Sequence, residues 1–180
     1  MFKLLSAIAG AFTVAAAAPA GVTTAYDITM KTIDGKPMPF SAYRGKVLLV
    51  VNTASFCGFT PQYEALQKVQ KTFTPKGFSV IGVPSGDFLG QEYKSNSEIK
   101  QFCESKFGIN FPMTEKSKVT GRDAAPFFAW AGASLGAPKW NFHKYLVGRD
   151  GRLIAGFPST VKPDAPEVTL AIEKALAARA

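Results

Sequence analysis

A continuous apolar run at residues 46–51, Lys-Val-Leu-Leu-Val-Val, is followed at once by a polar loop and a helix-start signal. The run is rich in β-branched residues and does not alternate, which is typical of a strand buried in a parallel sheet. Thr60 and Pro61 favour a helix start, with the threonine as the cap and the proline in the first helical position. Cys57 is therefore predicted to lie in the loop between the end of a central strand and the beginning of a helix.

Cys57 is the strongest candidate for a chemically active residue. Loops at the carboxyl ends of strands are where open α/β sheets collect ligands and catalytic groups. The free amides and partial positive charge at a helix start stabilise a nearby thiolate and make it nucleophilic. A structural loop cysteine is the alternative, because free cysteines are usually buried in cores.

The N-terminus has the pattern of a secretory signal peptide. Lys3 gives a positive start, residues 4–18 are apolar, and an Ala-Pro-Ala triplet ends at Ala20. We expect residues 1–20 to be removed, with cleavage after Ala20 or, alternatively, after Ala25. A membrane anchor is the rival interpretation, but the run is short and rich in alanine for a spanning helix. Export to a periplasm or the cell exterior follows, where disulfides persist.

Residues 26–180 are expected to form one domain, because they contain no repeats or linkers and are long enough for a real core. The expected elements, in chain order, are a hairpin of Tyr26–Ile33 and Lys36–Phe40, a strand at Lys46–Asn52, a helix at Pro61–Phe73, a strand at Phe78–Val83, helices at Ser95–Phe107 and Pro126–Ala131, strands at Lys144–Val147 and Leu153–Phe157, and a helix at Pro163–Ala178. The first half predicts a right-handed parallel crossover and the second half an antiparallel hairpin. The fold class is therefore α/β: a thioredoxin-like fold with a central mixed β-sheet flanked by helices and an N-terminal β-hairpin.

The formal charge of +8 is spread over scattered lysines. A dispersed basic surface favours solubility and allows attraction to acidic proteins or anionic lipid. Without a basic patch or an aromatic platform, nucleic acid is not an expected partner.

The second cysteine, Cys103, is 46 residues from Cys57, so zinc-ligand spacing and a vicinal dithiol are both excluded. Cys103 lies in the expected helix Ser95–Phe107 and shares an apolar face with Ile99 and Phe102. It is either an inert core thiol or a resolving thiol, meaning one that attacks an oxidised Cys57. Resolution would require the helix to open, because a disulfide needs the two Cα atoms within about 7 Å.

Three separated segments resemble conserved regions of the glutathione peroxidase family. Residues 52–60, Asn-Thr-Ala-Ser-Phe-Cys-Gly-Phe-Thr, resemble the peroxidatic motif, with cysteine where some members have selenocysteine. Residues 102–112 resemble the second cysteine region, and residues 139–147 resemble the Trp-Asn motif. The resemblance runs in unbroken order from Tyr26 to the C-terminus.

The resemblance implies a peroxidase mechanism. The Cys57 thiolate would attack a peroxide oxygen and become a sulfenic acid, releasing water or alcohol. The indole N–H of Trp140 and the amide of Asn141 would donate hydrogen bonds to the charge that develops on the leaving oxygen. No cofactor or metal is implied. His143, the only histidine, is assigned no role and is expected to be a surface or packing residue.

One position departs from the family. The usual sequence Pro-Cys-Asn-Gln-Phe-Gly-Gly-Gln-Glu is replaced at residues 84–92 by Pro-Ser-Gly-Asp-Phe-Leu-Gly-Gln-Glu, so that Asp87 stands where the active-site glutamine is expected. An ionised carboxylate near the sulfur would disfavour the thiolate, whereas a protonated one could donate a hydrogen bond. Gln91 is not expected to replace the glutamine unless the loop is rearranged.

The short segment 131–138 resembles the small, monomeric, phospholipid-hydroperoxide-like branch of the family, whose two-cysteine members are usually recycled by thioredoxin. We therefore predict a thiol peroxidase that reduces hydrogen peroxide and organic hydroperoxides through Cys57, with Cys103 as the resolving thiol. A thioredoxin-like protein or glutathione is the expected reductant, a monomer the expected state, and a lipid peroxide the only expected membrane contact. The alternatives are a thiol–disulfide exchange or oxidant-sensing protein, and a binding module that has lost catalysis.

Overall fold

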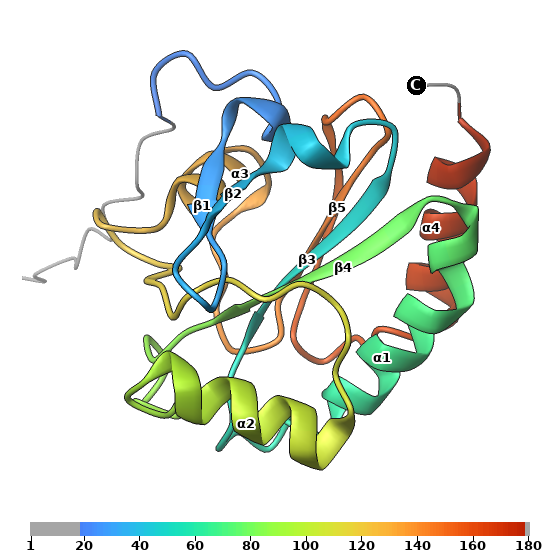
Figure 1. Ribbon diagram of the computed structural model, residues 1–180. Coiled ribbons are helices and arrows are strands. Elements are labelled where there is room, and N and C mark those ends of the chain that lie inside the picture. Colours follow the sequence, from blue (N-terminus) through green and yellow to red (C-terminus); the bar gives the residue numbers. More distant parts are fainter. Residues whose placement is uncertain (1–18, 179–180) are drawn as a thin grey trace, which may run out of the picture.

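A four-stranded mixed sheet lies at the centre of the computed structural model, which describes residues 19–178 (Figure 1). Its strands, in sheet order, are β4 (Phe78–Pro84), β3 (Val47–Thr53), β5 (Lys144–Val147) and β6 (Leu153–Phe157). β3 pairs parallel to β4, and the β3–β5 and β5–β6 pairs are antiparallel. All seven residues of β3 are buried, as its apolar run predicts. The predicted thioredoxin-like sheet is therefore confirmed.

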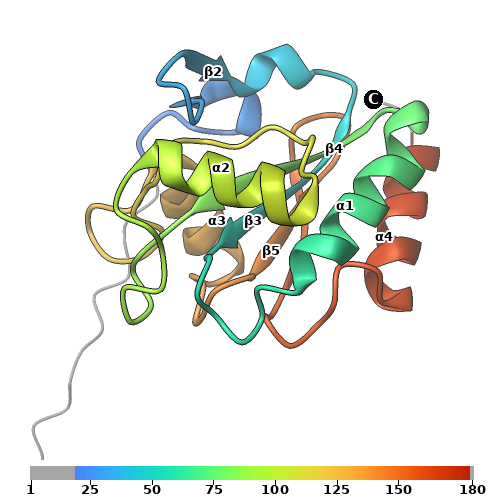
Figure 2. The same cartoon turned by 60° about the horizontal axis from the view of Figure 1, so that its bottom comes forward.

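Helices and the N-terminal hairpin cover the two faces of this sheet. The core on one face joins Val47, Leu49 and Val51 of β3 to the helices α1 (Gln62–Phe73), α2 (Asn96–Phe107) and α4 (Pro166–Ala177). Figure 2 shows α2 lying next to α1. The opposite core joins Leu48 and Val50 to α3 (Pro126–Leu135) and to the hairpin of β1 (Thr29–Lys31) and β2 (Pro37–Pro39). The alternation of β3 side chains thus assigns successive residues to opposite cores.

Several element boundaries differ from the sequence expectation. Each hairpin strand has only three residues, because short 3-10 turns at Ala25–Asp27 and Phe40–Tyr43 take the outer parts. α3 continues past Ala131 to Leu135. α4 begins at Pro166 rather than Pro163, because the later proline occupies the first turn.

The start and end of α2 follow the sequence closely. The Ser95 hydroxyl accepts the Glu98 amide N–H at 3.3 Å, and the Glu98 carboxylate accepts the Ser95 amide N–H at 3.1 Å. This reciprocal pair confirms the predicted capping box. Gly108 ends the helix with a left-handed φ of 59°, which glycine adopts without strain.

The expected signal peptide, residues 1–20, lies almost wholly outside the described residues. Within residues 19–178, no helix is both long and apolar enough to cross a membrane.

Candidate active site

Three chain segments meet beyond the carboxyl ends of β3 and β4. The first is the Cys57 loop, defined as residues 54–60, and the second is the loop of residues 85–95 after β4. The third is the turn at Trp140 and Asn141 before β5. Because β3 and β4 are parallel, their following loops leave the same edge of the sheet. This is where the sequence places the candidate nucleophile.

Cys57 lies at the start of a series of turns that leads into α1. Its carbonyl oxygen accepts the Thr60 amide N–H at 2.9 Å, and the carbonyls of Phe59 and Thr60 accept the next amides toward the helix. The Phe59 amide N–H points at the Cys57 Sγ over 3.4 Å. An amide donor at a helix start stabilises negative charge on sulfur. The Cys57 residue is 8% exposed, so it is largely buried but keeps some contact with solvent.

The predicted helix start at Thr60 and Pro61 needs a correction. Pro61 occupies the N-cap position and α1 begins at Gln62, one residue later than expected. Thr60 does not cap α1 with its side chain. Its hydroxyl accepts the Cys57 amide N–H and donates to the Ala54 carbonyl, each at 2.9 Å. Thr60 therefore braces the Cys57 loop from inside.

The turn of Trp140 and Asn141 is anchored to β3 by Asn52. The Asn52 side-chain amide donates to the Trp140 carbonyl at 3.1 Å, and the Asn52 main-chain carbonyl accepts the Phe142 amide N–H at 2.6 Å. Phe142 has a left-handed φ of 64°, an uncommon conformation for a non-glycine residue that is often found at functional sites. Trp140 packs against the core cluster that contains Cys57. The structure thus brings both predicted donors to the Cys57 side of the sheet.

The Asp87 side chain is turned toward the segment of residues 119 and 120. Its carboxylate accepts the amide N–H groups of Val119 and Thr120 at 2.7 and 3.0 Å, and the Thr120 hydroxyl at 3.0 Å. These bonds hold the Asp87 side chain against the loop that contains residues 119 and 120. Among the described residues, its carboxylate forms no hydrogen bond to the Cys57 loop. The expectation of a carboxylate beside the sulfur is not supported by this geometry.

Gln91 is the residue that joins the three segments, although from the sequence it is not expected to replace the family's glutamine. Its side-chain carbonyl accepts the Asn141 amide at 3.0 Å, and its main-chain carbonyl accepts the Phe56 amide at 3.0 Å. Left-handed φ angles at Leu89 (56°) and Gly90 (64°) turn the chain so that Gln91 faces inward. The Gly90 is the one sequence signal for this turn, because glycine adopts such a conformation freely.

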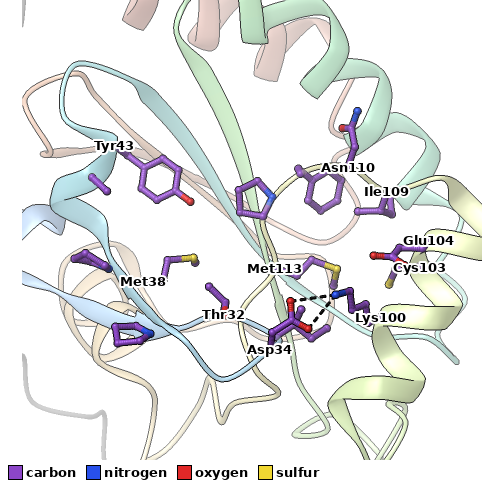
Figure 3. Close-up of a pocket in the computed structure, with 16 residues that line it drawn as sticks. Thr32, Asp34, Met38, Tyr43, Lys100, Cys103, Glu104, Ile109, Asn110 and Met113 are labelled. Atoms are coloured by element: carbon purple, nitrogen blue, oxygen red, sulfur yellow. Dashed lines mark hydrogen bonds and ion pairs between the residues drawn. The ribbon is translucent and has the colours of Figure 1, made fainter.

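Cys103 lies within α2 and is fully buried. It borders a cavity of about 470 Å³ between α2 and the N-terminal hairpin, across which Lys100 and Asp34 form an ion pair (Figure 3). Burial raises the pKa of the Cys103 thiol to about 11. Both cysteines are free, and no disulfide joins them in the described chain.

Two further titratable groups lie near the Trp140 turn without contacting the thiols. Burial, with a smaller effect of Lys144, lowers the pKa of His143 to about 4, so the imidazole is neutral at physiological pH. Its ring packs on Tyr145 with 4.6 Å between centroids, as a packing histidine does. Lys144 is fully buried, and its ammonium donates to the Phe142 carbonyl at 2.6 Å.

Fold and site together describe a thioredoxin-fold oxidoreductase in which Cys57, at the start of the turns that lead into α1, lies in a core cluster against which Trp140 packs. A sequence profile described as glutathione peroxidase matches residues 25–131. The chain belongs to the glutathione peroxidase family. It is accordingly a thiol-dependent peroxidase that reduces hydroperoxides.

Individual relatives and solved structures agree with this assignment. The chain is 43% identical to the hydroperoxy fatty acid reductase gpx1 of Synechocystis, over 85% of this chain and 96% of the relative. It is 42% identical to the glutathione peroxidase-like peroxiredoxin gpx1 of Schizosaccharomyces pombe, over 77% of this chain and 91% of the relative. The crystal structure of Trgpx in apo form superposes with a TM-score of 0.69 at 33% identity, covering 87% of this chain and 97% of that one.

A likeness in fold alone extends to a thioredoxin-family thiol:disulfide interchange protein from Chlorobium tepidum. The TM-score is 0.62 at 22% identity, over 88% of this chain and 99% of the other.

Proposed function

We propose that Cys57 is the peroxidatic nucleophile. Its thiolate attacks one peroxide oxygen, the O–O bond breaks, and Cys57 becomes a sulfenic acid while the leaving oxygen takes a proton to form water or an alcohol. The observation that carries this proposal is the Phe59 amide N–H aimed at the Cys57 Sγ over 3.4 Å, at the start of the turns that lead into α1.

Trp140, Asn141 and Gln91 supply the donors for the leaving oxygen in this proposal. One N–H of the Asn141 amide bonds the Gln91 carbonyl, which leaves its second N–H and the NH₂ group of Gln91 free to donate. None of the three side chains titrates, so they act by hydrogen bonding. Asp87 has no part in this step, because its carboxylate already accepts three hydrogen bonds from residues 119 and 120.

Cys103 resolves the sulfenic acid in this proposal. The Cys103 sulfur attacks the Cys57 sulfur, the S–O bond breaks, and water leaves as the disulfide forms. Cys103 is buried inside α2, so that helix must unwind locally first. A thioredoxin-type protein then reduces the disulfide, with glutathione as the competing candidate. The peroxiredoxin name of the Schizosaccharomyces pombe relative supports a thioredoxin-type reductant.

We extend the proposal to fatty acid hydroperoxides as substrates. The name of the Synechocystis relative supports this class, and so do two exposed apolar side chains on the site loops. Phe56, next to Cys57, is 54% exposed, and Leu89 on the loop after β4 is 79% exposed. Apolar surface beside the nucleophile favours a substrate with an acyl chain.

We further propose that the protein is exported and monomeric. The intact mass of the mature protein would test removal of the signal peptide, and light scattering would test the monomeric state.

The decisive experiment follows peroxide consumption with thioredoxin and its reductase, or with glutathione, as electron source. Hydrogen peroxide and a fatty acid hydroperoxide are compared as oxidants. Cys57→Ser is expected to abolish turnover, and Cys103→Ser is expected to keep the first oxidation but lose turnover with thioredoxin. Turnover retained by Cys57→Ser would overturn the proposal. Cys103→Ser with wild-type turnover would make Cys103 a core thiol instead.

A further inference from the structure

A buried carboxylate, Glu92, lies between the Cys57 loop and the helix that carries Cys103. The preceding residue, Gln91, is hydrogen-bonded to the Cys57 loop, because its main-chain carbonyl accepts the Phe56 amide N–H at 3.0 Å. The following residue, Tyr93, packs between Phe56 and Phe102. The centroid of its ring is 4.4 Å from that of Phe56 and 5.6 Å from that of Phe102. Phe56 and Phe102 are the chain neighbours of the two cysteines. Residues 91–93 therefore contact both the Cys57 loop and the helix that carries Cys103.

The Glu92 carboxylate is incompletely paired. The residue is 5% exposed, and its Oε1 accepts the Tyr93 amide N–H at 2.9 Å. Its Oε2 is buried without a hydrogen-bond partner among the described residues. Buried polar atoms almost always have partners, and a carboxylate that lacks one calls for an explanation.

Other unpartnered oxygens surround the same place. The hydroxyls of Thr53, Ser55 and Tyr63 are also buried without hydrogen-bond partners in the described chain. The Ser55 hydroxyl lies beside the Glu92 carboxylate and stabilises its charge, and the Tyr63 hydroxyl lies beside both the Cys103 thiol and the Thr53 hydroxyl. These contacts place hydroxyl groups next to the Glu92 carboxylate and next to the Cys103 thiol, where such groups can pass a proton.

The resolving step needs such a group. Burial raises the pKa of Cys103 to about 11, so the thiol is almost fully protonated at neutral pH, and only its thiolate attacks efficiently. Burial also raises the pKa of the Glu92 carboxyl above its ordinary value, which makes it a stronger base than an exposed glutamate.

We propose that Glu92 accepts the proton of the Cys103 thiol as that sulfur attacks the oxidised Cys57. This inference rests on the proposed cysteine-pair mechanism. The S–S bond forms as the S–O bond of the Cys57 sulfenic acid breaks. The proton taken from Cys103 then passes from Glu92 to the departing hydroxide, so that water is released and the carboxylate is restored. The peroxide has already supplied the oxidising equivalents.

The groups around Glu92 determine how this step depends on pH. The Ser55 hydroxyl and the Tyr93 amide come from the site loops, and Lys116 comes from the segment after α2. Tyr63 on α1 and Cys103 on α2 also interact with Glu92. Burial raises the pKa of the Cys103 thiol to about 11 and raises the pKa of the Tyr63 hydroxyl well above its ordinary value. The resolving rate should therefore fall as pH drops through the pKa of Glu92.

The test is a single turnover of the full mature protein with one equivalent of hydrogen peroxide. Samples are quenched with an alkylating reagent, and mass spectrometry measures the Cys57 sulfenic acid and the Cys57–Cys103 disulfide over time. Glu92→Gln is expected to leave the oxidation of Cys57 unchanged and to slow disulfide formation by about 100-fold, within the range that positioned acid–base groups contribute. It should also abolish the acidic limb of the pH profile of the second step.

Glu104→Gln is the matched control. Glu104 is the exposed chain neighbour of Cys103 and also raises its pKa, but it does not lie between the thiols. It is expected to keep the wild-type rate and pH profile, and Glu92→Asp is expected to recover part of the lost rate.

Three results would overturn the inference. One is a wild-type rate of disulfide formation in Glu92→Gln, and another is an unchanged acidic limb. The third is a wild-type protein that forms the sulfenic acid but no disulfide. This last result would leave Cys57 as the peroxidatic residue and remove only the resolving role of Cys103. The proposed nucleophile is tested separately by Cys57→Ser, because loss of the first oxidation in that variant does not depend on Glu92.

Discussion

The side-chain amide of Asn141 donates a hydrogen bond to the side-chain carbonyl of Gln91 over 3.0 Å. This bond joins the turn before β5 to the loop after β4, and the main-chain carbonyl of Gln91 continues the connection to Phe56. Two loops that are 50 residues apart in the chain are thereby held beside the Cys57 loop. The side chains that we propose as donors to the leaving oxygen depend on this connection for their orientation.

Replacing Gln91 should impair catalysis, whereas replacing Asp87 should impair stability. Gln91→Ala removes the acceptor of Asn141, and we expect the rate of Cys57 oxidation to fall roughly tenfold or more, as loss of oriented donors does. Asp87→Ala leaves the Val119 and Thr120 amides without their acceptor, and we expect a loss of about 1 kcal/mol of unfolding free energy. Stopped-flow oxidation and urea unfolding measure the two effects. A larger kinetic defect in Asp87→Ala than in Gln91→Ala would contradict the site as described.

Thr60 should support both the stability and the reactivity of the Cys57 loop. Thr60→Val removes the two hydrogen bonds to Cys57 and Ala54, and we expect a loss of about 2 kcal/mol, at about 1 kcal/mol for each bond. The peroxide rate should fall as well, because the loop is freed. Thr60→Ser keeps the hydroxyl and is expected to resemble the wild type in both measurements. Equal behaviour of the valine and serine variants would show that the hydroxyl is unimportant.

Lys144 should make stability depend on pH above neutrality. Burial lowers its pKa from 10.5 to about 7 in the folded protein, so between these values the unfolded chain binds one more proton than the folded one. The unfolding free energy should therefore rise with pH across this window, by at most about 1.4 kcal/mol per pH unit from this group. Below about pH 7 the full cost of the buried charge is present.

Lys144→Met removes that cost. We expect it to stabilise the protein most at pH 6 and least at pH 10, measured as the difference in unfolding free energy from the wild type at each pH. A difference that does not change with pH would mean that the Lys144 amine titrates normally.

Tyr93 should limit the opening of α2. Its ring packs on Phe56 and Phe102, so it holds the loop after β4 against the helix. Cys103 is fully buried, and alkylation must therefore wait for the helix to open. In a Cys57→Ser background, we expect Tyr93→Leu to speed alkylation of Cys103 about tenfold, equivalent to about 1.4 kcal/mol of lost packing. Tyr93→Phe keeps the ring and should alkylate at the parent rate, and a fast Tyr93→Phe variant would argue against ring packing as the cause.

The sequence by itself determined the elements whose signals are local. The apolar run at residues 46–51 predicts the buried central strand, and the capping box of Ser95 and Glu98 predicts the start of α2. Both rest on backbone and side-chain preferences within one element. The position of Cys57 between strand and helix follows from the same signals.

Only the tertiary structure decided which residue of the loop after β4 contacts the turn of Trp140 and Asn141. Asp87 occupies the family's glutamine position, yet its carboxylate turns to the amides of residues 119 and 120, and Gln91 reaches Asn141 instead. The same holds for Glu92, which is buried in a loop whose next residue, Tyr93, packs on Phe102 of α2. These choices are made by hydrogen bonds and contacts between segments far apart in the chain. The local sequence does not show which of two polar residues on one loop, Asp87 or Gln91, forms a hydrogen bond to a given distant segment.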